Sequence, residues 1–202
     1  MEKYVLLFLD FFGTVVFAMT GAARAKECHL DFFGVIVLGC TVGVGGGMIR
    51  DCLIGVKPVS ALTNEWYLIC CIATSCFIFF KPPKKQKLSP WNFITICDAI
   101  GLGVFAAFGA AKALEDGLTL IGVILSAVVT AAGGGVIRDL MTGGIPVVLR
   151  SDFYATAALF GGWLYWELYW EGIHGLAICL IVASFVTGLR LLAVKMQLQL
   201  PR

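Results

Sequence analysis

The chain has 202 residues, of which 59% are hydrophobic and 14% are charged, and its mean hydropathy is +0.92. A sequence that is apolar nearly throughout is typical of a protein that spans a membrane several times. The formal net charge of +2 is too small to favour nucleic acid as a partner. We therefore expect an all-α polytopic membrane protein that is surrounded by membrane lipids.

Seven segments are long and apolar enough to be considered as membrane crossings, since a transmembrane helix needs about 20 mainly apolar residues. They leave little sequence for a water-soluble domain, so we expect a single membrane domain over residues 1–202. In chain order the predicted segments are Val5–Ala23, Phe32–Ile49, Glu65–Phe80, Trp91–Ala111, Gly117–Ile137, Asp152–Tyr169 and Ile173–Val194.

The connection between the third and fourth segments predicts the orientation of the chain. It carries four lysines in the seven residues from Lys81 to Lys87, and short loops rich in lysine and arginine stay on the cytoplasmic side. With this loop inside, eleven lysines and arginines fall on the cytoplasmic side and four on the outer side. The N-terminus is therefore predicted outside and the C-terminus in the cytoplasm.

The chain contains an internal repeat with a shift of 88 positions. Residues 10–59 align with residues 98–147 without a gap, and 23 of the 50 pairs are identical. Each unit contains three predicted crossings, an odd number, so the second unit must enter the membrane from the opposite side. We expect two inverted repeats over residues 1–80 and 91–170, joined by the basic loop 81–90 and followed by a seventh helix within residues 171–202. Transporters with such repeats hold their substrate or ion site near mid-membrane, at interrupted helices.

The sequence GGGxIRD occurs once in each repeat, at Gly45–Asp51 and at Gly133–Asp139. Consecutive glycines are poor helix formers because each loses much backbone entropy when it is ordered. We predict that the second and fifth helices are broken at these triplets and open a path between the repeats. The alternative is close helix packing, since small residues let membrane helices approach one another. The predicted pathway glycines are Gly45, Gly46, Gly47, Gly133, Gly134 and Gly135.

Six charged residues complete the predicted pathway, because charges at bilayer depth are costly and normally face the bundle interior or water. We hypothesise that Asp10 and Asp98 pair with the arginines across the repeat interface and line a polar route. One alternative is a purely structural ion pair. Another is that each arginine–aspartate pair ends its helix at the membrane surface, with the arginine reaching outward. The six residues are Asp10, Arg50, Asp51, Asp98, Arg138 and Asp139.

The sequence does not indicate an enzyme. The stretch GVGGGMIRD lacks the Lys-Ser/Thr ending of a phosphate-binding loop, and the apolar segments carry no Ser-His pair or metal-ligand cluster. Most of the eight cysteines lie in apolar segments and are interpreted as small buried hydrophobic residues. We therefore expect no catalytic residues, no cofactor and no metal site.

The doubled GGGxIRD motif on the second and fifth of seven helices, together with Asp10 and Asp98, resembles the glycine-transporter domain family of small bacterial membrane proteins. That family is similar in architecture to the trimeric intracellular cation (TRIC) channels, which have seven helices, glycine-kinked second and fifth helices and one pore per subunit. The resemblance implies a pathway between the two three-helix bundles, a homotrimer, and a place in the bacterial cytoplasmic (inner) membrane.

Three functions are compatible with the sequence. Transport of a small polar solute, above all a small amino acid such as glycine, is favoured by the inverted repeat. Fixed charges of both signs would match the ammonium and the carboxylate of such a zwitterion. The alternative is a monovalent cation (potassium) channel of the TRIC type. A scaffold without any transport activity is the third possibility.

Overall fold

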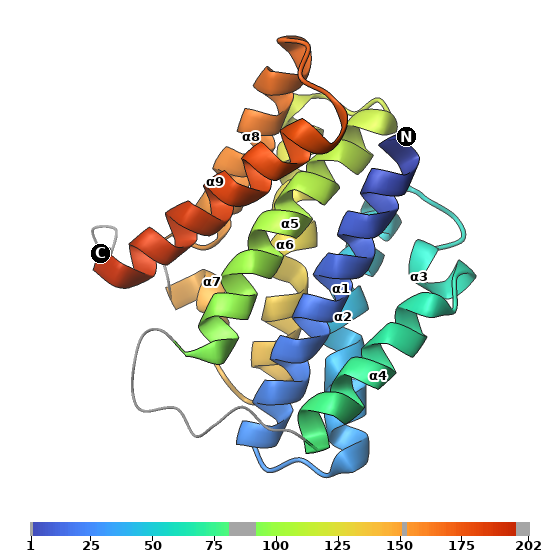
Figure 1. Cartoon of the computed structure of the whole chain (residues 1–202), viewed down its shortest axis with the longest axis vertical. Helices are drawn as coiled ribbons and strands as arrows, with labels where there is room; N and C mark the ends of the chain where they lie inside the picture. Colours follow the sequence, from blue (N-terminus) through green and yellow to red (C-terminus); the bar gives the residue numbers. More distant parts are fainter. Residues whose placement is uncertain (1, 81–91, 151–152, 197–202) are drawn as a thin grey trace.

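The computed structural model describes residues 2–80, 92–150 and 153–196, and these residues form nine helices (Figure 1). The all-helical fold predicted from the sequence is confirmed, whereas the basic loop predicted over residues 81–90 lies outside the described residues. The helices are α1 Glu2–Glu27, α2 Phe32–Ile54, α3 Ser60–Thr63, α4 Trp66–Phe80, α5 Phe93–Glu115, α6 Leu120–Met141, α7 Val147–Arg150, α8 Ala155–Trp170 and α9 Gly175–Met196.

Five helices, α1, α2, α5, α6 and α9, are long and apolar enough to cross a membrane. Helices α4 and α8 are shorter, with 15 and 16 residues. At about 1.5 Å per residue they are roughly 22–24 Å long, less than the hydrocarbon thickness of about 30 Å. They occupy the third and sixth predicted segments, so the seven crossings of the sequence-based prediction stay a prediction.

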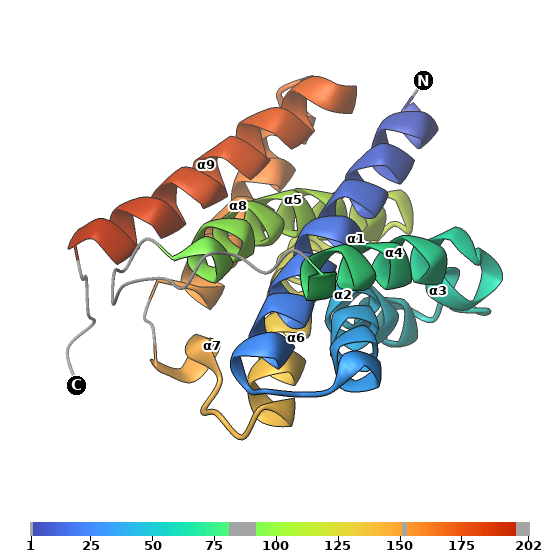
Figure 2. The ribbon, with the colours of Figure 1, turned by 60° about the horizontal axis from the view of Figure 1, so that its bottom comes forward.

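The helices of the first half recur in the same order in the second half, from α1–α4 to α5–α8. In both halves two long helices are followed by a helix of four residues and then by a shorter apolar helix. The sequence colours of Figure 1 show that α1 and α5 run in opposite directions, as do α2 and α6. Helix α9 has no counterpart among the described helices and packs along α5 and α8 at one side of the molecule (Figure 2).

The same glycine turn follows the GGGxIRD motif in both halves. Gly55 (φ 82°) and Gly143 (φ 70°) adopt the left-handed conformation that a residue with a side chain rarely takes. The next amides then bond back to the motif, Val56 N–H to the Asp51 carbonyl at 2.9 Å and Gly144 N–H to the Asp139 carbonyl at 2.8 Å. The turn ends each helix and leads the chain into α3 or α7.

The predicted break at the glycine triplets is wrong, because α2 and α6 are continuous α-helices through Gly45–Gly47 and Gly133–Gly135. The triplets lie where α2 crosses α6 between the two halves. A Cβ at Gly46 would collide with the Thr130 carbonyl oxygen, and one at Gly134 with the Val42 carbonyl oxygen. The alternative of close packing explains these central glycines, since without side chains they let the backbones of α2 and α6 come into van der Waals contact.

Candidate transport pathway

Two clusters of polar side chains lie in the fold, one in each repeat. In both, the second long helix supplies an arginine and an aspartate near its end, and the first long helix supplies another aspartate. A tyrosine comes from α4 in the first repeat and from the residue before α8 in the second. All eight residues are buried, with no more than 8% of their surface exposed. The first cluster consists of Asp10, Arg50, Asp51 and Tyr67, and the second cluster consists of Asp98, Arg138, Asp139 and Tyr154.

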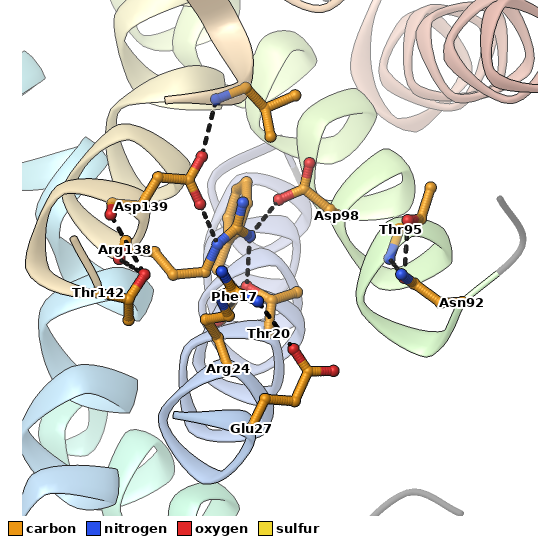
Figure 3. Close-up of polar contacts among 11 residues, drawn as sticks. Phe17, Thr20, Arg24, Glu27, Asn92, Thr95, Asp98, Arg138, Asp139 and Thr142 are labelled. Atoms are coloured by element: carbon orange, nitrogen blue, oxygen red, sulfur yellow. Dashed lines mark hydrogen bonds and ion pairs between the residues drawn. The ribbon is translucent and has the colours of Figure 1, made fainter. Parts of the chain in front are cut away.

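In the second cluster the guanidinium of Arg138 is shared among three acceptors (Figure 3). It donates to Asp98 Oδ1 at 2.5 Å, to Asp139 Oδ1 at 3.0 Å and to Thr20 Oγ1 at 3.3 Å. Hydrogen bonds with a charge on both partners are stronger than neutral ones. Arg138 therefore ties α6 to α5 within its own repeat and to α1 of the other repeat.

In the first cluster the equivalent groups choose different partners. Arg50 donates twice to Asp51 Oδ1, at 2.9 and 2.7 Å, and its buried Nη1 has no hydrogen-bond partner among the described residues. Asp10 instead accepts a hydrogen bond of 2.5 Å from the Tyr67 hydroxyl. The guanidinium of Arg50 lies over the ring of Phe108 at 4.7 Å from its centroid, a cation–π contact with the other repeat.

The second aspartate of each cluster joins its helix to the chain that follows. Asp51 Oδ2 accepts from the Ser60 amide at 2.9 Å, and Asp139 Oδ2 accepts from the Val147 amide at 2.8 Å. Each carboxylate thus uses one oxygen for its neighbouring arginine and the other for the start of α3 or α7. The glycine turn after the motif brings these amides back to the aspartates.

The hypothesis that Asp10 and Asp98 pair with arginines across the repeat interface needs correction. Asp98 pairs with Arg138 inside repeat two, and Asp10 accepts from Tyr67 inside repeat one. The contacts that cross the interface come from the arginines, Arg138 to Thr20 and Arg50 to Phe108. Nor do the arginines point outward to the membrane surface, since Arg50 and Arg138 are only 2% and 3% exposed.

The clusters border cavities of very different size. The first cavity has a volume of about 10 Å³ and is lined by residues of which none is exposed, including Asp10, Arg50 and Phe105. The second cavity has a volume of about 300 Å³ and extends from Asp98 and Arg138 to exposed residues. Its charged lining residues are Arg24, Glu27, Asp98, Arg138, Asp139, Arg150 and Arg190.

The glycines of the two triplets divide between packing and the clusters. A Cβ at Gly135 would lie 2.7 Å from the Tyr154 hydroxyl oxygen and 3.7 Å from Asp98 Oδ1. A Cβ at Gly47 would lie 3.7 Å from Nη2 of Arg50, and Gly47 lines the first cavity. The third glycine of each triplet therefore leaves room for the charged groups. The first glycines pack against the facing helix, Gly45 towards Ile137 and Gly133 towards Gly46.

The tyrosines were missed by the sequence analysis. Tyr67 and Tyr154 are 87 positions apart, so the ungapped shift of 88 placed them out of register. A shift of 87 after the prolines aligns Glu65-Trp66-Tyr67 with Asp152-Phe153-Tyr154, and it also aligns Ser60 with Val147, whose amides bind equivalent aspartates. A one-residue gap in the repeat alignment would have found both tyrosines.

An all-helical and largely apolar fold that buries a charged cluster in each of its two repeats defines a polytopic membrane protein with a polar interior. The sequence profile of the family described as "Glycine transporter" matches residues 7–82 and 95–170, one match in each repeat. The chain belongs to this family of membrane transport proteins.

Three bacterial relatives carry names without a substrate. A UPF0126 membrane protein of Vibrio cholerae is 37% identical over 202 residues, which cover 100% of this chain and 84% of that protein. The UPF0126 inner membrane protein YadS of Escherichia coli is 34% identical over 198 residues, covering 98% and 95%. The UPF0126 membrane protein YvgT of Bacillus subtilis is 43% identical over 156 residues, covering 76% of each chain.

Solved structures of cation channels share the fold over nearly the whole chain. The TRIC trimeric intracellular cation channel orthologue from Rhodobacter sphaeroides has a TM-score of 0.89 and 35% identity, covering 96% of this chain and 99% of that chain. A prokaryotic TRIC channel crystallised in KCl has a TM-score of 0.89 and 35% identity, covering 98% and 100%. The resemblance inferred from the doubled motif is thus confirmed.

Proposed function

We propose that the chain conducts a monovalent cation such as potassium along a path between its two repeats. The observation that carries this proposal is the formal charge of the first cluster. It holds two aspartates and one arginine, and one excess negative charge in a medium of low dielectric constant attracts a cation. The second cluster also holds two aspartates and one arginine, but the buried guanidinium of Arg190 lies over its Tyr154 ring at 5.0 Å and adds a second positive charge.

The likeness to TRIC cation channels over nearly the whole chain supports the same function. In this proposal α1, α2, α4, α5, α6, α8 and α9 all cross the membrane, as two inverted three-helix repeats and a seventh helix in one domain. The N-terminus lies outside and the C-terminus in the cytoplasm of a bacterium, with the chain in the inner membrane. The chain assembles as a homotrimer with one path in each subunit.

Transport of a small zwitterion such as glycine is the second candidate, and the lining of the second cavity favours it. This cavity of about 300 Å³ carries four arginines and three acidic residues. Arginine binds carboxylates through paired hydrogen bonds, and a carboxylate binds an ammonium group. The description of the family points to the same solute.

Purified protein in liposomes separates the two candidates. Potassium efflux and uptake of radiolabelled glycine are measured in the same preparation, with protein-free liposomes as the control. Potassium flux that rises linearly with concentration and produces unitary currents in a planar bilayer supports the channel. Saturable glycine uptake without unitary currents would instead establish the transporter, and the absence of both fluxes would contradict membrane transport by this path.

A further inference from the structure

A pair of aromatic rings lies where the two repeats meet. Phe17 of α1 and Phe105 of α5 occupy equivalent positions in the repeats and are 0% and 2% exposed. Their rings stack with centroids 5.2 Å apart and an interplanar angle of 28°. The two most buried long helices of the fold therefore contact each other through matched aromatic side chains.

Each ring fits against a glycine of the opposite helix. A Cβ at Gly101 would lie 3.2 Å from the nearest carbon of the Phe17 ring, and a Cβ at Gly13 would collide with the Phe105 ring. These glycines are also equivalent in the repeat, and each lies three residues after the aspartate of its cluster. The rings thus occupy the level of the helices directly next to Asp10 and Asp98.

Polar groups approach the ring pair from both sides. On one side, Phe105 lines the first cavity together with Asp10 and Arg50. On the other side, Thr20 lies one helical turn after Phe17 on α1, and its hydroxyl accepts from Arg138 at 3.3 Å (Figure 3). The rings are therefore the apolar layer between the first and second clusters.

The arginines bracket this layer in a symmetric way. Arg50 contacts Phe108, and Arg138 contacts Thr20. Phe108 and Thr20 are equivalent in the repeat, and each lies three residues after its ring, about one helical turn further along. The order through the molecule is consequently Arg50, Phe105, Phe17 and Arg138, with charge on the outside and two aromatic rings in the middle.

We propose that the stacked rings of Phe17 and Phe105 are the gate of the transport path. An apolar constriction blocks ions and polar solutes because water leaves it. A cation or zwitterion can pass from one cluster to the other only when the rings separate, and each ring packs against a glycine of the opposite helix in the present structure. This inference rests on the proposed function, since it assigns a gate to that same path.

Removing either ring tests the gate. Phe17→Ala and Phe105→Ala are expected to raise potassium efflux from liposomes by about tenfold or more, because each opens the apolar layer to water. Phe17→Leu keeps most of the volume but not the flat ring, and it is expected to raise the flux by a smaller factor. The matched control is Phe160→Ala on α8, an exposed phenylalanine that lines neither of the two cavities, which is expected to leave the flux unchanged.

The outcomes separate the gate from the function itself. Variants are compared only when gel filtration and helix content match the wild type, and Phe17→Leu keeps the test open if an alanine variant fails to fold. Potassium flux in the wild type that is unchanged in the folded ring variants would overturn the gate but not the function. Flux in neither the wild type nor any folded variant would overturn the proposed function. Flux that appears or rises with the ring variants alone supports the gate.

Discussion

The two polar clusters contain the same residue types at equivalent positions, yet their chemistry differs. Arg138 donates to three acceptors, whereas within the described part of the chain Arg50 bonds only to Asp51 and leaves Nη1 without a partner. The cavity beside the second cluster has a volume of about 300 Å³, against about 10 Å³ beside the first. Internal sequence symmetry thus produces a common scaffold without producing two identical sites.

One position explains part of the difference. Thr20 and Phe108 are equivalent in the repeat, and both face the arginine of the other half. The threonine hydroxyl accepts a hydrogen bond, but the phenylalanine offers Arg50 only the face of its ring. Leaving a buried donor without an acceptor costs about 1–3 kcal/mol, so the first cluster is held less firmly than the second.

The largest expected effect is that of replacing the central arginine of the second cluster. Arg138→Met keeps an unbranched apolar stem but leaves Asp98 and Asp139 without their cation, and breaking a buried ion pair costs about 3–5 kcal/mol. We expect a smaller loss for Arg50→Met, since Arg50 pairs with one carboxylate, that of Asp51, among the residues that the structure describes. Thermal unfolding in detergent measures both.

The exposed pair of Arg24 and Glu27 serves as the control for this comparison. Arg24→Met is expected to change the free energy of unfolding by less than about 1 kcal/mol, because exposed ion pairs contribute little. Equal losses for Arg138→Met and Arg50→Met would contradict the view that the second cluster is the stronger one.

Neutralising the aspartate on the first long helix of each repeat is expected to lower the potassium flux more in the second cluster than in the first. Asp98→Asn removes the charge that Arg138 binds at 2.5 Å, and hydrogen bonds to charged groups contribute about 1.5–3 kcal/mol. Potassium flux should fall by roughly ten- to hundredfold in this variant, with expression and assembly intact. Asp10→Asn keeps an acceptor for the Tyr67 hydroxyl, so its flux should fall less.

Liposome flux assays on the two asparagine variants provide the measurement, normalised to the amount of reconstituted protein. The exposed Glu115→Gln at the end of α5 is a suitable control, since its ion pair with Lys112 has a separation of 3.9 Å at the surface. Flux that is unaffected by Asp98→Asn would remove the second cluster from the path.

The crossing of α2 and α6 should respond equally in both halves. Gly46→Ala and Gly134→Ala each place a methyl group against a carbonyl oxygen of the facing helix, and overpacking costs about 1–3 kcal/mol. Gly188→Ala on α9 is the control, because a Cβ there meets no atom within 4 Å. Melting temperatures should drop for the first two and stay or rise slightly for the third. A marked difference between Gly46→Ala and Gly134→Ala would contradict the view that the two glycines contribute equally to the packing of α2 against α6.

The smallest expected effect is that of Thr20→Val, which removes one acceptor from Arg138 and keeps the shape of the side chain. The bond has a length of 3.3 Å, and a typical hydrogen bond contributes about 0.5–1.5 kcal/mol. A drop of the melting temperature by a few degrees is expected, from a loss of about 1 kcal/mol. Circular dichroism in detergent detects it, and Thr41→Val, whose hydroxyl bonds within its own helix to the Val37 carbonyl, is the control. A larger loss in the control would exclude a special role for Thr20.

Much of the fold could be predicted because it depends on local composition. Apolar runs predicted the long helices within a few residues, and the repeat predicted that α5–α8 would copy α1–α4. The cost of charge in an apolar setting favoured a buried position for Asp10 and Asp98, but for Arg50 and Arg138 the sequence left a position at the membrane surface open. The glycine triplets were misjudged because helix propensity is a weak property that tertiary packing overrides.

The sequence by itself determined that this is a helical membrane protein built from two related halves, with matched charges in each. Only the tertiary structure decided which partner each charge takes. Arg138 meets Thr20 across 118 positions of the chain, and Asp10 meets Tyr67 across 57, so these contacts depend on how the helices cross. The close approach at Gly46 and Gly134 sets that crossing, and a repeat alignment records which residues are equivalent but not which atoms touch.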